Sequence, residues 1–213
     1  MKHYTKVEQV YARDPHNGKK LKEGSFNNPV VEYLKDNQWV FTEKVDGTNI
    51  GVVWDGYRVS FQGRTDSADI YPKLLDKLNE LFMGDENEEL FEQKFHDMGV
   101  ILFGEGYGPN VAAKSKLYGP DYNFILFDVY IPSKDLWMTR ESIEDIANYF
   151  GISPVPIVME GTINDAVEYV RTQPKSTLSD NAPMEGLVGK PKVEVLDRQG
   201  KRTLIKVKAK YFK

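Results

Sequence analysis

The sequence predicts an α+β fold in a single domain that spans residues 1–213. The chain has 213 residues, of which 40% are hydrophobic and 28% charged, and a chain of this composition and length can bury a sizeable core. Strand-like and helix-like segments are mixed without the strict alternation that a parallel βαβ fold requires. There is no cysteine, which excludes disulfide scaffolds, zinc ribbons and cysteine nucleophiles.

The charge is distributed unevenly along the chain. The formal net charge is −4, yet residues 190–213 hold nine Lys and Arg residues against two acidic ones. A basic end on an acidic body is compatible with a local phosphate-binding surface or with a lysine-rich edge strand. No apolar run approaches the roughly 18 residues of a spanning helix, and the first residues lack a signal-peptide core. We therefore expect a cytoplasmic protein without a membrane partner.

Hydrophobic periodicity and turn residues place the expected elements. Strands are expected at 38–43, 48–54, 57–62, 100–105, 123–131, 186–190, 192–196 and 203–209. Asp55-Gly56 predicts a hairpin turn between the second and third of these strands. Helices are expected around 74–82, at 86–98, between an N-cap at Thr139 and a stop at Gly151, and at 164–171.

Several common catalytic motifs are missing. No glycine-rich phosphate loop of the Walker type is present, and Gly104-Glu105-Gly106-Tyr107-Gly108 fails the dinucleotide fingerprint because Pro109 holds the place of its last glycine. The three histidines show no spacing typical of metal ligands or a catalytic triad, so we expect them at the surface.

One segment carries a candidate nucleophile, Glu43-Lys44-Val45-Asp46-Gly47. It fits a hairpin whose tight turn is Asp46-Gly47 and whose lysine points to solvent. It also fits covalent catalysis, in which the lysine amine, with an ordinary pKa of about 10.4, must lose a proton before it attacks phosphorus. Nearby cations favour that loss, so a lysine nucleophile predicts further lysines close to it in space.

Further polar residues follow Lys44 at the ends of predicted strands. They are Arg64 after a hairpin, Glu105 between two glycines, Phe127-Asp128 in an apolar strand, Glu185 before Gly186, and Lys206 with Lys208. Because side chains alternate along a strand, Lys206 and Lys208 share one face.

This ordered set resembles the covalent nucleotidyltransferase superfamily of ATP-dependent ligases and RNA-capping enzymes. Glu43-Lys44-x-x-Gly47-Thr48-Asn49 is most similar to the RNA ligases of the bacteriophage RNA ligase 2 and RNA-editing branch, and the resemblance runs from about Trp39 to Lys208. It implies a nucleotidyltransferase (adenylation) domain with antiparallel sheets flanked by helices, an ATP-grasp-like ligase core. The resemblance also implies that the C-terminal OB or helical domain of other ligases is missing here.

The resemblance implies an ATP-dependent RNA ligase that uses ATP and Mg²⁺ or Mn²⁺. Lys44 would form a lysyl-AMP, pass the AMP to an RNA 5′-phosphate, and so allow an RNA 3′-hydroxyl to complete the phosphodiester. Such an enzyme would serve RNA repair in a cytoplasm, including that of a bacteriophage-infected host. RNA is the implied partner, and no protein partner is inferred.

The resemblance also assigns roles to individual residues. It places at the nucleotide Thr42, Glu43, Asn49, Arg64, Glu105, Phe127, Glu185, Lys206 and Lys208. Phe127 would stack on adenine, Thr42 and Glu43 would lie near the adenine edge through backbone or side-chain groups, and Lys206 and Lys208 would stabilise the transferring phosphate. Glu105, Glu185 and Asp46 offer oxygen ligands for the metal, directly or through water.

Each of these positions has a plainer structural explanation. Phe127 could be a core aromatic, Glu105 and Glu185 surface carboxylates, and Lys206 and Lys208 an exposed edge, while Asp128 is expected to hold a nearby loop. Asp46 also departs from the histidine usual in relatives of RNA ligase 2.

The alternative functions are of three kinds. The same lysine chemistry could serve a DNA ligase or a GTP-dependent capping enzyme, or the fold could be a catalytically silent nucleic-acid-binding module. A glycosidase using Glu105 and Glu185 would leave Lys44, Lys206 and Lys208 unexplained. Without a C-terminal domain, the hold on RNA is expected to be weak and salt-sensitive.

Overall fold

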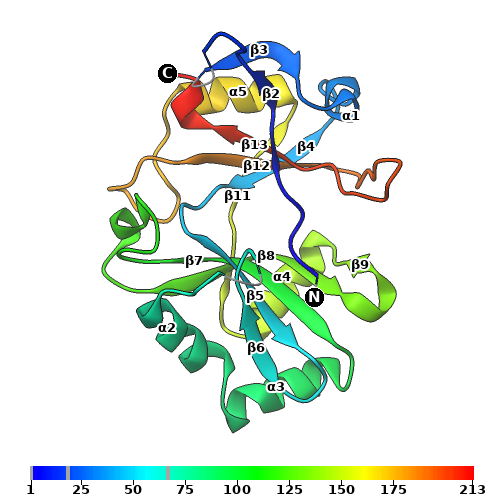
Figure 1. The fold of residues 1–213 in the computed structure, drawn as a ribbon, viewed down its shortest axis with the longest axis vertical. Coiled ribbons are helices and arrows are strands. Elements are labelled where there is room, and N and C mark those ends of the chain that lie inside the picture. Colours follow the sequence, from blue (N-terminus) through cyan, green and yellow to red (C-terminus); the bar gives the residue numbers. More distant parts are fainter. Residues whose placement is uncertain (1, 18–19, 66–67) are drawn as a thin grey trace. The chain divides into compact units, whose positions relative to one another are not determined.

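The computed structural model describes residues 2–17, 20–65 and 68–213 of the chain. It confirms the α+β class, with two main sheets and helices packed on them (Figure 1). The chain divides into two compact units, and each is built from segments that are distant in the sequence. Unit 1 comprises Met1–Tyr4 and Asp46–Val155, and unit 2 comprises Thr5–Val45 and Pro156–Lys213.

Unit 1 is built on a six-stranded sheet with the order β10-β8-β7-β5-β6, to which β9 adds beside β8. All pairs are antiparallel except β10 with β8. The elements are β5 (Thr48–Trp54), β6 (Val59–Gln62), α2 (Pro72–Phe82), α3 (Asp85–Phe95), β7 (Val100–Tyr107), η1 (Ser115–Tyr118), β8 (Asn123–Ile131), η2 (Pro132–Lys134), β9 (Leu136–Trp137), α4 (Arg140–Tyr149) and β10 (Ser153–Pro154).

The predicted hairpin between β5 and β6 is confirmed. Asp55 accepts hydrogen bonds on Oδ1 from the backbone N–H groups of Tyr57 and Arg58, both at 2.8 Å. Gly56 adopts φ +103°, a conformation that side chains disfavour. These contacts hold the two strands in the register in which Trp54 faces Val59.

The core of unit 1 lies between one face of its sheet and the helices α2, α3 and α4. Leu74, Leu78 and Phe82 project from α2 into this core and are fully buried. Thr139 caps α4 by accepting a hydrogen bond from the Ser142 N–H, as the sequence predicts. We call the opposite face of this sheet the open face, because no helix of unit 1 belongs to its small cluster around Ile101, Phe103, Phe127, Tyr130 and Trp137.

Unit 2 is built on a five-stranded sheet with the order β1-β13-β12-β4-β11, in which only β1 pairs in parallel. Its elements are β1 (Glu8–Gln9), β2 (Tyr11–Arg13), β3 (Leu21–Phe26), α1 (Pro29–Tyr33), β4 (Trp39–Glu43), β11 (Ile157–Gly161), α5 (Ile163–Arg171), β12 (Gly186–Pro191), β13 (Ile205–Lys208) and η3 (Ala209–Tyr211). Helices α5 and α1 and the β2–β3 hairpin pack on one face of the sheet, around Trp39, Phe41, Leu187 and Val207.

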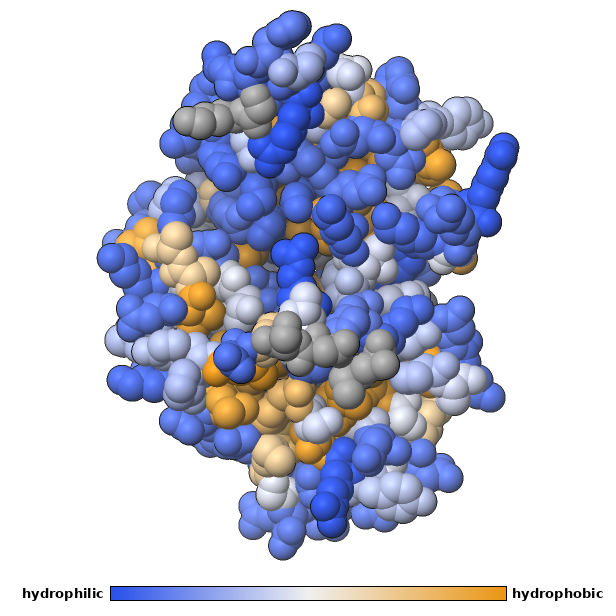
Figure 2. Space-filling view, in the orientation of Figure 1, coloured by the Kyte–Doolittle hydropathy of each residue, from blue (hydrophilic) through white to orange (hydrophobic). Residues whose placement is uncertain are grey.

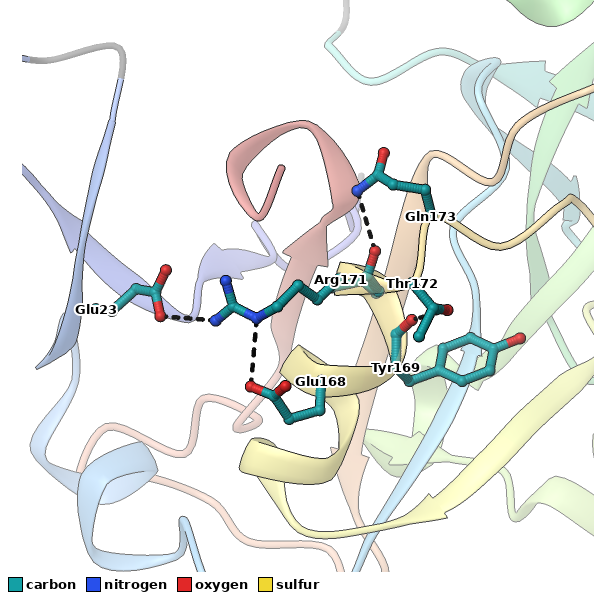
Figure 3. A network of polar contacts seen from close by, with 7 residues as sticks. Glu23, Glu168, Tyr169, Arg171, Thr172 and Gln173 are labelled. Carbon is teal, nitrogen blue, oxygen red and sulfur yellow. Dashed lines mark hydrogen bonds and ion pairs between the residues drawn. The ribbon is translucent and has the colours of Figure 1, made fainter.

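The C-terminal end of α5 ties several segments of unit 2 together (Figure 3). Arg171 forms ion pairs with Glu23 of β3 at 2.9 Å and with Glu168 at 3.3 Å. Gln173 donates hydrogen bonds to the backbone oxygens of Val170 and Ala209, both at 3.2 Å. The end of the helix is therefore linked to the β2–β3 hairpin and to η3, which follows β13.

One predicted strand is wrong. Residues 192–196 form no strand, although β12 reaches Pro191 and the turn around Gly200 is present. Pro191 lies opposite Trp39, the first residue of β4, so the chain beyond Pro191 runs past the end of its neighbour. Val193, whose apolar side chain favoured a strand, is 78% exposed. Strands β1 to β3, β11 and helix α1 were not predicted.

The surface in Figure 2 is mostly hydrophilic, with smaller hydrophobic patches between the charged side chains. Among the residues that the structure describes, none of the helices is both long enough and apolar enough to cross a membrane.

Truncation of Leu78 tests the helix-to-sheet core of unit 1. Leu78 is 0% exposed, so Leu78→Ala leaves a cavity under α2 and is expected to lower the free energy of unfolding by about 3 kcal/mol. Leu136→Ala is the matched control, since Leu136 is 48% exposed and its truncation is expected to have little effect. Urea unfolding followed by circular dichroism measures both. Equal losses in the two variants would contradict the assigned core.

Candidate active site

The face of the unit 2 sheet opposite its core carries a row of lysines. Residues alternate along β4 and β13, so Phe41 and Val207 enter the core while Thr42, Lys206 and Lys208 lie on the other face. Lys206 is opposite Val188, which is opposite Thr42 on the next strand. The predicted common face of Lys206 and Lys208 is thus confirmed.

Lys44 follows β4 directly and lies beside the start of β12. Its backbone N–H donates to the Gly186 oxygen at 2.9 Å, and Gly186 is opposite Lys208 in the sheet. Three strands therefore bring Lys44, Glu185 and Lys208 together, although the first and last are separated by most of the chain. The spacing of a lone Lys-x-Asp-Gly segment does not by itself predict that these three residues are neighbours.

Glu185 is bound between the two lysines. Its Oε2 lies 2.6 Å from Lys44 Nζ and its Oε1 lies 2.6 Å from Lys208 Nζ. The Glu185 side chain is 14% exposed, and the two lysine side chains are 22% exposed. Burial raises the pKa of the Glu185 carboxyl, but the charge of Lys44 and the hydrogen bonds and charge of Lys208 outweigh it, so the pKa lies below its ordinary value. Glu185 is therefore an anion held by two cations.

Gly186 allows this arrangement because β12 and β13 approach closely there. A Cβ at position 186 would lie 2.1 Å from the Val207 oxygen, and the residue has φ +152°. No side chain fits in that space without separating the strands. Glycine at 186 therefore keeps Glu185 next to Lys208.

Glu43 points away from the lysine face. Its side chain is buried, and its carboxylate accepts hydrogen bonds from the Ser176 hydroxyl at 2.5 Å and from the Thr177 backbone N–H at 2.7 Å. The Thr177 hydroxyl donates to the same carboxylate at 2.5 Å. The Glu43 carboxylate, one of the groups expected near an adenine edge, is thus hydrogen-bonded within the protein. Thr42, the other residue expected there, lies on the lysine face.

Sequence reasoning missed Ser176, Thr177 and Lys190. The two hydroxyl residues lie between predicted elements, and nothing in their spacing points to Glu43. Lys190 could have been found, because positions 186, 188 and 190 of one strand share a face, which places Lys190 on the face of Lys206.

The expected residues of unit 1 gather on the open face of its sheet. Asn49 lies directly opposite Glu105 on the neighbouring strand. Ile50, the next residue of β5, enters the helix-covered core, so the Asn49 side chain faces the other way. Arg64 is exposed two residues beyond Gln62, which ends β6 opposite Gly51.

A β-bulge places Phe127. Phe103 pairs with Asp128 and Gly104 pairs with Leu126, so Phe127 is the extra residue on its strand. Leu126 belongs to the helix-side core, while the partly exposed Phe127 packs in the cluster of the open face. Asp128 is fully buried and accepts a hydrogen bond from the Tyr4 hydroxyl at 2.5 Å. The expected structural role of Asp128 is confirmed, although its partner is the N-terminal segment.

The hairpin interpretation of Asp46-Gly47 is wrong, because β4 and β5 are strands of two different sheets. Gly47, the residue after Asp46, instead packs against Glu105. A Cβ at Gly47 would lie 2.9 Å from Glu105 Cγ, so the Glu105 side chain packs over this glycine. Asp46 accepts a hydrogen bond on Oδ2 from the Lys114 N–H at 2.8 Å, and its own N–H donates to the Tyr118 hydroxyl at 2.9 Å. Carboxylate oxygens such as those of Asp46 and Glu105 are the hard ligands that Mg²⁺ and Mn²⁺ accept. Within the described ranges, no group of three or more His, Asp or Glu residues is arranged to hold a metal ion.

The chain is similar to known RNA ligases. A model of the RNA ligase family matches residues 37–208. Naegleria gruberi RNA ligase with PPi shares the fold with a TM-score of 0.62 at 22% identity, covering 84% of this chain and 52% of that chain. No curated protein sequence matches the chain.

Two mutant structures of the same Naegleria gruberi ligase are similar as well. The one with AMP and Mn has a TM-score of 0.62 at 20% identity and covers 84% of this chain and 52% of its own. The one with ATP and Mn has a TM-score of 0.62 at 18% identity and covers 97% of this chain and 60% of its own. The chain therefore spans about half the length of the solved ligases.

These likenesses show a common fold, and the family model covers most of the sequence, including every strand that carries the lysine face. The chain belongs to the RNA ligase family.

Proposed function

We propose that the chain is an ATP-dependent RNA ligase that joins RNA 5′-phosphate and 3′-hydroxyl ends through lysyl-AMP and RNA-adenylate. The observation that carries the proposal is Lys44 bound through Glu185 to Lys208 on one face of the unit 2 sheet. In a member of the RNA ligase family, this gives a candidate nucleophile next to a second cation. We further propose that residues 1–213 act as a single nucleotidyltransferase domain that includes both units.

The first step transfers AMP to the protein. The Lys44 Nζ attacks the α-phosphorus of ATP, a P–N bond forms, the bond to the β-phosphate oxygen breaks, and pyrophosphate leaves with its electron pair. An ammonium has no lone pair, so Lys44 must release a proton before it attacks. The bond between the Lys44 ammonium and Glu185 has to change for this, because the lone pair of the amine must point at the phosphorus.

The lysine face supplies charge to the phosphates. Lys208, freed from Glu185, and Lys206 on the same face can donate to the oxygens of the transferring phosphate, where negative charge accumulates. Lys190 adds a further cation to this face. A preorganised row of ammonium groups needs little rearrangement when the phosphates arrive.

The open face of unit 1 supplies the proposed contacts to the nucleoside. The partly exposed ring of Phe127 offers a stacking surface for adenine, worth on the order of 1–3 kcal/mol in other base-binding proteins. Asn49 and Glu105 lie opposite each other and offer hydrogen-bond partners for the ribose. Arg64, which is exposed and follows the end of β6 by two residues, is a further proposed contact to the nucleotide. Thr42 and the backbone of Glu43 are proposed at the adenine edge.

The carboxylates have a second proposed role. Asp46, Glu105 and Glu185 are the proposed ligands of Mg²⁺ or Mn²⁺, directly or through water. A bound divalent cation would neutralise phosphate charge and assist the departure of pyrophosphate. The donor set of carboxylate oxygens fits such an ion.

The later steps use RNA. An oxygen of the RNA 5′-phosphate attacks the phosphorus of lysyl-AMP, the P–N bond breaks, and Lys44 regains its amine. The 3′-hydroxyl then attacks the 5′-phosphorus, loses its proton and displaces AMP. We propose that this serves repair of broken RNA in the cytoplasm, including that of a bacteriophage-infected host.

Intact-protein mass after incubation with ATP and Mg²⁺ tests the first step. We expect a gain of one AMP in the unaltered chain and none in Lys44→Ala, because this variant lacks the amine proposed to attack the α-phosphorus. GTP and NAD⁺ serve as controls. Retention of AMP by Lys44→Ala would refute the mechanism, and a GMP adduct would point to a capping-type enzyme. Sealing of a labelled RNA with a 5′-phosphate, compared with the same DNA, tests the acceptor.

Removal of the second cation tests the role of the lysine face. Lys208→Ala is expected to slow lysyl-AMP formation by about two orders of magnitude, as the loss of one transition-state charge contact usually does. Lys210→Ala, an exposed neighbour just beyond β13, is the matched control. Single-turnover adenylylation measures both rates. Similar rates for the two variants would exclude a role for Lys208 in the transfer.

The Glu185 carboxylate also gives a prediction that does not depend on activity. Its pKa is lowered in the folded state, so its ion pairs stabilise the fold fully above the ordinary carboxyl value of about 4.5. This stabilisation is lost as the pH falls through the lower pKa of the folded state. We expect Glu185→Gln to flatten the decline of unfolding free energy in that range. Glu89→Gln, on the exposed side of α3, is expected to leave the decline unchanged.

A further inference from the structure

The N-terminal segment lies on the open face of unit 1. The Gln62 side chain donates a hydrogen bond from Nε2 to the Lys2 oxygen at 2.8 Å. Lys2 Nζ lies 4.7 Å from the centre of the Tyr130 ring. Two residues later, the Tyr4 hydroxyl donates to the buried Asp128 at 2.5 Å. Residues 2–4 are therefore held on this face by contacts to two different strands, β6 and β8.

Tyr4 is the centre of an aromatic group on that face. Its ring lies 4.8 Å from the ring of Phe127 at an angle of 65°. It also lies 5.3 Å from Phe103 and 5.5 Å from Trp137. Rings at such distances attract each other and restrict each other's rotation. Phe127 is thus packed against Tyr4 on one side and partly exposed on another.

Because of the bulge, Tyr4 can contact two consecutive residues of β8. Along a regular strand, Phe127 and Asp128 would face opposite ways, but here Tyr4 contacts the ring of the first and the carboxylate of the second. The buried hydroxyl-to-carboxylate bond fixes the Tyr4 ring, and the Tyr4 ring in turn limits the positions of Phe127. Asp128, Tyr4 and Phe127 are thus linked by consecutive contacts.

We propose that Tyr4 is a positioning residue for the nucleotide base: it holds Phe127 in the orientation in which that ring stacks on adenine. This rests on the proposed function, in which Phe127 binds adenine. Tyr4 does not need to touch the nucleotide. A stacking ring that is already oriented loses less conformational freedom when the base binds, so the affinity for the base is higher.

Two binding probes separate this role from general support of the fold. The first is an ATP analogue with a methylene bridge between the α- and β-phosphates, which binds but cannot release pyrophosphate. The second is tripolyphosphate, which has the phosphates without the base. Affinities of both are measured by calorimetry with the full chain, Tyr4→Phe and Tyr4→Ala.

Tyr4→Ala is expected to weaken binding of the ATP analogue by about threefold to tenfold, in line with the loss of an aromatic contact. Tyr4→Phe keeps the ring but loses the bond to Asp128, so we expect a smaller weakening. Neither variant is expected to change the affinity for tripolyphosphate. Tyr57→Ala, which removes an 80% exposed tyrosine of the same unit, is the control and should change neither affinity.

The outcomes distinguish the possibilities. Selective weakening of the ATP analogue in both variants supports the proposal. Unchanged affinity for the analogue in Tyr4→Ala overturns it, and so does equal weakening of both probes, which would mean that Tyr4 only supports the fold. Failure of the unaltered chain to gain AMP would refute the proposed ligase function, while the ratio of the two affinities would still decide the role of Tyr4.

Discussion

The Glu185 carboxylate, bound by Lys44 on one side and Lys208 on the other, is the interaction on which the candidate site depends. A buried anion with two cations is stable only if both stay close, because loss of either leaves charge that the protein cannot solvate well. The sheet register provides that closeness, since β12 lies between β4 and β13 and begins at Gly186. The three charged residues thereby hold the ends of three strands together before any substrate arrives.

The residues on the open face of unit 1 are positioned in a different way. Its helices cover one side of the sheet and leave the other to short segments, so polar residues can remain there without being buried in a large core. The bulge at Phe127 interrupts the alternation of side chains along β8, and Tyr4 contacts both Phe127 and Asp128 there. The charged residues of unit 2 and the aromatic residues of unit 1 are therefore each supported by the packing of their own unit.

Much of this could be predicted from the sequence. Long periodic segments such as β5, β8 and α2 follow from hydrophobic spacing and from turn and cap residues, and the shared face of Lys206 and Lys208 follows from alternation. The strand at 192–196 could not be rejected in this way, because its failure depends on where the neighbouring β4 begins. The pairing of Lys44 with Glu185 and the contacts of Tyr4 with Phe127 and Asp128 join residues more than 100 positions apart, and the bulge at Phe127 depends on how β8 pairs with β7. Local patterns carry no information about such pairs.

Gly47 limits which side chains this part of the chain can accept. A Cβ there would lie 2.3 Å from the Gly106 oxygen, so two backbones touch at this point and neither can move aside cheaply. Asp46, one residue earlier, has a partly exposed side chain, donates its backbone N–H to the Tyr118 hydroxyl and accepts a hydrogen bond on its carboxylate from the Lys114 N–H. A side chain at 47 would therefore force two backbone segments apart, whereas a different side chain at 46 would not. Glycine at 47 thus fixes the backbone from which the charge at 46 projects.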